Sequence, residues 1–104
     1  MPPSATGAGA SAAVRGTLGA MASTEEFEAA AKAVNALPET PPTEQMLALY
    51  GLYKQASSGD AKGGRPGLFD PRGRAKWDAW AARKGMSAEA ARTAYVALAK
   101  KLGA

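Results

Sequence analysis

Two tyrosines and a lysine stand at a spacing that suits a charged, aromatic ligand. Tyr50, Tyr53 and Lys54 occupy positions i, i+3 and i+4, so a helix would place them on one face. Met46 lies one turn before Tyr50 and would give this face an apolar floor. Phenol hydroxyls and a lysine ammonium donate to phosphate, and aromatic rings stack on a base. The pattern therefore favours binding of a phosphate attached to an aromatic base.

A second group of cations and aromatic residues follows later in the chain. Arg72, Lys76, Trp77 and Trp80 fall within one short segment, and Tyr95 follows in the last predicted helix. A lone aromatic residue in a small bundle usually packs in the core, and a run of cations is usually a solvated face. Hydroxyl and indole groups beside so many cations exceed what a core requires. We therefore expect a binding surface for an anion.

The composition excludes several kinds of chemistry. The chain of 104 residues contains no cysteine and no histidine, which rules out disulfides, Cys/His zinc sites and nucleophiles activated by an imidazole. The acidic residues offer neither a poised acid/base pair nor metal-ligand spacing. A net charge of +4 suggests an anionic partner without specifying it. The sequence thus indicates a binding protein without metal or cofactor, and not an enzyme.

Helix signals divide the chain after residue 22. Ser23 and Glu26 form a capping box, Thr43 is the expected N-cap of the next helix, and Asp70 and Ser87 are the expected caps of two more. We predict helices over about 24–37, 43–58, 72–84 and 88–102, with no strand. The long glycine-rich connection before the third helix would allow the second and third helices to run parallel. The fold class is therefore an all-α four-helix bundle.

Residues 1–22 are mostly small or polar, with Arg15 as the one charge, and we expect them to form a flexible tail. An organellar presequence is the alternative interpretation of this segment. The remaining residues, 23–104, are expected to form a single domain. No run approaches the roughly 18 apolar residues of a membrane span, so no stable insertion into a membrane is expected.

Five sequence blocks carry a resemblance to a known family. These are Y53-K54-Q55-A56, G59-D60, R65-P66-G67, K76-W77-D78-A79-W80, and G85 with S87. Phe27 with Ala30 and Ala31 extends the match upstream, and Ala94 with Tyr95 extends it downstream. In this order the blocks resemble the acyl-CoA-binding protein (diazepam-binding inhibitor) family from residue 23 to about residue 102.

The resemblance implies an up-down-down-up four-helix bundle that binds long-chain fatty acyl-CoA esters non-covalently and performs no reaction on them. It implies buffering and intracellular transport of these esters by a cytoplasmic monomer. Contacts with membranes or with enzymes that use acyl-CoA would be transient. It implies no nucleic-acid partner.

Carried over position by position, the resemblance also implies a set of ligand-binding residues. Tyr50 and Lys54 would hold the 3′-phosphate and adenine, and Lys76 would hold a second phosphate. Tyr95 would flank the nucleotide, while Arg72 and Trp77 would lie near the ligand. The acyl groove and the surface beside it would include Phe27, Ala31, Met46, Leu47 and Tyr53. Asn35 replaces a common lysine of the family and would give a hydrogen bond in place of a charge.

A different class of function fits the charge alone. A small basic helical module could bind nucleic acid or an acidic membrane surface. Such a module predicts cations gathered on one exposed face, whereas the cations here are spread over all four predicted helices and interleaved with acids. This distribution favours the acyl-CoA interpretation.

Overall fold

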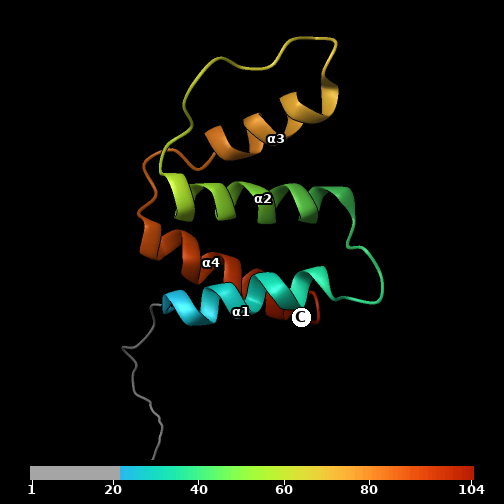
Figure 1. The fold of residues 1–104 in the computed structure, drawn as a ribbon, viewed down its shortest axis with the longest axis vertical. Coiled ribbons are helices and arrows are strands. Elements are labelled where there is room, and N and C mark those ends of the chain that lie inside the picture. Colours follow the sequence, from blue (N-terminus) through green and yellow to red (C-terminus); the bar gives the residue numbers. More distant parts are fainter. Residues whose placement is uncertain (1–21) are drawn as a thin grey trace, which may run out of the picture.

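The computed structural model describes residues 22–104 and folds them into four α-helices (Figure 1). They are α1 (Thr24–Asn35), α2 (Thr43–Ser58), α3 (Pro71–Ala81) and α4 (Ala88–Lys101). In Figure 1, α1 and α4 run in one direction while α2 and α3 run in the other. The predicted all-α, up-down-down-up arrangement is therefore confirmed. The predicted tail, except for Ala22, lies outside the described residues.

The helix starts follow the capping residues closely, with one exception. Glu26 N–H donates to Ser23 Oγ at 3.1 Å, and Ser23 N–H donates to Glu26 Oε1 at 2.9 Å. Asp70 and Ser87 also cap their helices. The expectation for Thr43 was wrong, because Thr43 is already helical and no side chain caps α2. Pro42 supplies the extended backbone that precedes this helix, with φ −53° and ψ 151°.

Two helices are shorter than the sequence pattern predicts. The first helix ends at Asn35 and not near residue 37, since Pro38 disfavours helical backbone at the residue before it. The third ends at Ala81, and the chain then turns through Gly85 at φ +87°. That positive φ suits glycine, which has no Cβ to clash.

The apolar core lies between α1, α2 and α4. Its buried residues are Phe27, Val34, Leu49, Leu52, Ala91, Tyr95, Val96 and Ala99. Helix α3 contributes no fully buried residue and packs on the outer side of α2. A Cβ at Gly51 would collide with the backbone oxygen of Ala79, so glycine allows the two helices to approach closely. Because none of its residues is fully buried, α3 depends on this contact and on the connection before it.

A buried amide ties that connection to both of its neighbours. Gln55 is 1% exposed, and its Nε2 donates to Asp60 Oδ1 and to the Met86 carbonyl, both at 2.8 Å. Asp60 Oδ1 also accepts from the Gly85 N–H at 2.8 Å. The end of α2, the start of the connection and the turn before α4 are therefore held at one point.

This arrangement gives stability a predictable dependence on pH. The hydrogen bonds from Gly85 and Gln55 lower the pKa of Asp60 below its ordinary value of 3.8, and Arg65 lowers the pKa of Asp78 in the same way. A carboxyl group whose pKa is lower in the folded state stabilises the fold above its unfolded pKa and loses that effect as pH falls. We expect a flat urea midpoint between about pH 5 and pH 8 and a drop below about pH 4.

The matched variant is Asp60→Asn, which keeps the shape of the side chain and removes the titrating carboxyl group. Its urea midpoint should be lower than that of the wild type at neutral pH and should fall less steeply in acid. An unchanged acid profile would show that the Asp60 contacts do not contribute to this dependence.

Candidate ligand-binding site

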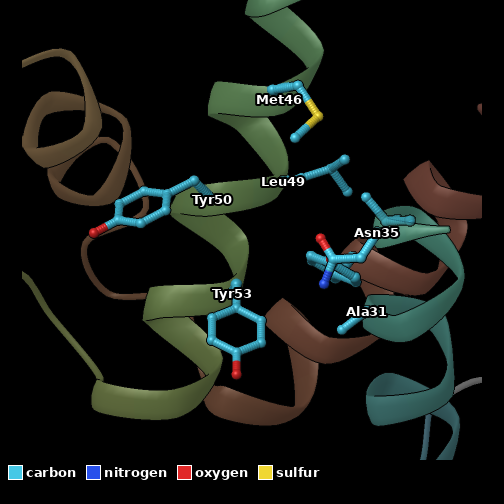
Figure 2. Close-up of a pocket in the computed structure, with 8 residues that line it drawn as sticks. Ala31, Asn35, Met46, Leu49, Tyr50 and Tyr53 are labelled. Carbon is cyan, nitrogen blue, oxygen red and sulfur yellow. The ribbon is translucent and has the colours of Figure 1, made fainter. Parts of the chain in front are cut away.

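A cavity opens between α1 and α2 because both helices pack on α4 while, within residues 22–104, their own backbones do not approach each other closely. Its volume is about 240 Å³. We call it the α1–α2 cavity, and Figure 2 shows its lining residues. They are Ala31, Val34, Asn35, Met46, Leu49, Tyr50, Tyr53 and Tyr95. In Figure 2 the Asn35 amide extends from α1 toward α2, so this wall offers a hydrogen-bonding group beside apolar and aromatic side chains.

Three aromatic rings stiffen one end of this cavity. The Phe27 ring centroid lies 5.2 Å from that of Tyr95, edge-on, and 5.3 Å from that of Tyr53. The Tyr53 and Tyr95 centroids are 6.1 Å apart. Edge-to-face contacts of this kind stabilise ring pairs beyond the area they bury. The cavity therefore has aromatic walls whose positions are set before any ligand binds.

The Tyr95 hydroxyl remains protonated at neutral pH. The ring is 5% exposed. This burial, together with the neighbouring Tyr53, raises the pKa of Tyr95 above its ordinary value of 10.0. The hydroxyl therefore keeps its proton and can act as a hydrogen-bond donor.

A second cavity lies between the start of α2 and the start of α3. We call it the α2–α3 cavity, and its volume is about 440 Å³. Its lining residues are Thr40, Pro41, Thr43, Met46, Leu47, Arg72, Ala75 and Lys76. Met46 lines both cavities, so they adjoin at this side chain. The lining combines apolar side chains with two cations.

Two lysines lie against aromatic rings between α2 and α3. Lys76 Nζ lies 5.4 Å from the centroid of Tyr50, whose ring points away from α1 in Figure 2. Lys54 Nζ lies 4.8 Å from the Trp80 ring centroid. Trp80 Nε1 donates to the Gly59 carbonyl at 2.6 Å, which fixes that ring. Cation–π contacts hold each ammonium near the surface without neutralising it.

The structure gathers most of the predicted site residues in these two cavities. Ala31, Asn35, Met46, Tyr50, Tyr53 and Tyr95 line the α1–α2 cavity, and Met46, Leu47, Arg72 and Lys76 line the α2–α3 cavity.

Three predicted site residues line neither cavity. Phe27 is 7% exposed and supports the tyrosine rings from behind. Lys54 lies over Trp80. Trp77 Nε1 donates to the Lys62 carbonyl at 3.2 Å, which places this indole beside the connection between α2 and α3.

Sequence reasoning did not assign several lining residues to the site. Val34 and Leu49 line the α1–α2 cavity while also belonging to the core. Their helical spacing signals an inward face but does not distinguish a cavity wall from a core position. Thr40, Pro41, Thr43 and Ala75 line the α2–α3 cavity, where only the tertiary structure brings the α1–α2 connection beside α3.

Metal and membrane features are absent from the described part of the chain. Residues 22–104 contain no group of three or more acidic, histidine or cysteine side chains that could hold a metal ion. Over the same range, no helix combines the length and apolar character needed to cross a membrane.

The four-helix arrangement and its two adjoining surface cavities define a small, helical ligand-binding protein. The profile of the family described as "Acyl CoA binding protein" matches residues 24–99. The chain belongs to this acyl-CoA-binding protein family, and the resemblance seen in the sequence is confirmed.

Individual relatives agree with this assignment. An acyl-CoA-binding protein of the plant Fritillaria agrestis is 51% identical over 82 residues, covering 79% of this chain and 94% of that protein. The acyl-CoA-binding protein of Saccharomyces cerevisiae is 50% identical over 76 residues, covering 73% and 87%. The crystal structure of acyl-CoA-binding protein 2 from Oryza sativa matches with a TM-score of 0.72 at 49% identity, covering 75% of this chain and 87% of that one.

Proposed function

We propose that this protein binds long-chain fatty acyl-CoA esters non-covalently, buffers them and carries them within the cell. The observation that supports this most directly is the pair of adjoining cavities with different linings. One has aromatic walls, the other is larger and has an apolar lining with two cations, and Lys76 lies where they meet. A ligand with an aromatic base, phosphates and a long apolar chain has complementary parts in one molecule.

The α1–α2 cavity suits the adenine end of CoA. Rings of Tyr50 and Tyr53 can stack on a base, and the Asn35 amide can donate to and accept from its edge. Lys54 lies one turn after Tyr50 on α2, and Lys76 reaches the Tyr50 ring from α3. We assign Tyr50 and Lys54 to the 3′-phosphate and Lys76 to a second phosphate. A hydrogen bond from a lysine ammonium to a phosphate is charge-assisted and therefore stronger than one between neutral groups.

The α2–α3 cavity suits the acyl chain. Met46 and Leu47 supply flexible apolar surface, and Ala75 leaves room between the helices. Each buried methylene contributes about 0.8 kcal/mol, so a chain of about 14–16 carbons could supply roughly 10 kcal/mol before ordering costs. Arg72 lies at this cavity, where its guanidinium can attract the phosphates.

The remaining predicted residues have supporting parts in this proposal. Ala31 and Tyr95 complete the wall around the nucleotide. Phe27 keeps Tyr53 and Tyr95 in place, and Trp77 holds the connection beside α3. Thioester cleavage would find neither a cysteine thiolate nor a hydroxyl activated by an imidazole, since the chain lacks cysteine and histidine. We infer a cytoplasmic, monomeric carrier that leaves its ligand chemically unchanged and releases it to membranes or enzymes in transient contacts.

The experiment that tests this function separates the two halves of the ligand. Isothermal titration calorimetry should show one palmitoyl-CoA bound per chain. Free palmitate and free CoA should each bind at least about a hundredfold more weakly, because each lacks one of the two sets of contacts. Equal affinity for palmitate and palmitoyl-CoA would indicate a fatty-acid carrier instead. Equal affinity for CoA and palmitoyl-CoA would indicate a nucleotide-binding protein.

A further inference from the structure

Two large apolar side chains are exposed next to each other at the start of α3. Leu68 is 79% exposed and Phe69 is 102% exposed, and they are the most exposed large hydrophobic residues in the described chain. Neither lines the α1–α2 cavity or the α2–α3 cavity. Exposed apolar side chains placed side by side commonly mark an interaction site.

The backbone at this point is a tight turn. Asp70 N–H donates to the Gly67 carbonyl at 3.1 Å, which makes Leu68 and Phe69 the two central residues of the turn. Turn positions usually carry glycine, proline, asparagine or aspartate. The choice of leucine and phenylalanine is therefore not explained by the turn itself.

Hydrogen bonds flank the turn on both sides. The Asp70 side chain accepts from Gly73 N–H at 3.0 Å as the N-cap of α3, and Pro71 occupies the first helical position. On the other side Arg65 makes two hydrogen bonds to Asp78, at 2.7 and 2.6 Å, which tie the connection to α3. An apolar turn that is already ordered loses little conformational freedom when it binds a partner.

Cations outnumber carboxylates by three to one between Leu68 and Lys76. Arg72 and Arg74 follow within the first turn of α3, and Lys76 follows one turn later. The acid among them, Asp70, is the helix cap. An apolar tip flanked by cations is complementary to a membrane surface with anionic headgroups, where basic residues add attraction to apolar insertion.

We propose that Leu68 and Phe69 insert reversibly into the interface of an anionic lipid membrane and dock the protein there. Arg72, which is exposed, would face the headgroups beside the inserted side chains. Figure 1 shows the start of α3 on the outer side of the bundle, away from α1 and α4, so the turn can reach a flat surface first. Docking in this way would bring the α2–α3 cavity, which Arg72 lines, next to the lipid.

Vesicle sedimentation of the full chain, without acyl-CoA, tests the proposal independently of the proposed function. With vesicles of phosphatidylcholine containing about 30% phosphatidylserine, the variant Leu68→Ser/Phe69→Ser should bind at least about tenfold more weakly than the wild type. Phe69→Trp should bind as well as the wild type or better, because indole prefers the membrane interface. Binding should weaken in high salt and on pure phosphatidylcholine.

Controls separate docking from folding and from ligand binding. The serine variant should keep the wild-type unfolding temperature and palmitoyl-CoA affinity, since both side chains lie in solvent outside the cavities. Unchanged vesicle binding by this variant would overturn the proposal. So would a dimer in size-exclusion chromatography that the variant abolishes without weakening vesicle binding, because the turn would then be a contact between two copies of the chain.

Discussion

Affinity for CoA thioesters should rise by at least about two orders of magnitude from the octanoyl to the palmitoyl ester. The longer chain adds methylenes that can enter the α2–α3 cavity, and each contributes about 0.8 kcal/mol when fully buried. The expected rise is smaller than full burial would give, since the chain also loses conformational freedom. Calorimetric titration of a series of chain lengths measures this slope. Equal affinities for acetyl-CoA and palmitoyl-CoA would contradict the assignment of this cavity to the chain.

A space-filling variant locates the chain more sharply. Ala75→Leu should narrow the α2–α3 cavity and weaken palmitoyl-CoA binding more than octanoyl-CoA binding. The matched control is Ala97→Leu, which adds the same atoms at an exposed position on α4 outside both cavities. This control should leave the affinity for every ester of the series unchanged. If Ala75→Leu weakened binding equally for every chain length, the acyl chain would lie elsewhere.

Lys54→Ala and Lys76→Ala should each weaken palmitoyl-CoA binding by about 1.5–3 kcal/mol, the range for a hydrogen bond to a charged group. Neither variant should unfold the protein, because neither ammonium group lies in the buried core. Lys101→Ala is the matched control, since this exposed lysine ends α4 outside both cavities and removes the same charge. Its effect should stay below about 0.5 kcal/mol.

A ligand without the 3′-phosphate identifies which lysine contacts that group. The wild type should lose affinity for the dephospho-CoA thioester, and Lys54→Ala should lose little more when it binds this ligand. Such a double cycle isolates the pairwise contact from the general effect of charge. Independent, additive losses would mean that Lys54 acts only through the overall positive field, and the assignment to the 3′-phosphate would be wrong.

Local sequence signals predicted the helices well where one residue determines the backbone. The capping box at Ser23 and the Asp70–Pro71 pair act within a single turn, so their effect can be seen without tertiary information. Thr43 could not be judged in this way, because Pro42 before it already supplies the extended backbone. The length of the connection between α2 and α3 allowed these helices to run parallel, and the family resemblance implied that they do.

The site could be predicted only where residues share one helix face. Helical spacing brought Met46, Tyr50 and Tyr53 together, and all three line one cavity. Spacing could not show that Tyr95 would be almost fully buried. Nor could it show that the Trp77 indole would donate a hydrogen bond to the Lys62 carbonyl in the connection before α3. It also gave no sign of the close approach at Gly51, since that depends on where a different helix lies.

Native mass spectrometry tests the central claim, the binding of one acyl-CoA per chain, most directly. The full chain is measured as purified from cells, and again after stripping and addition of one equivalent of palmitoyl-CoA. The account predicts an adduct of one long-chain acyl-CoA per chain in the first sample and of one palmitoyl-CoA in the second. A protein that takes up no palmitoyl-CoA in the second sample would contradict the account.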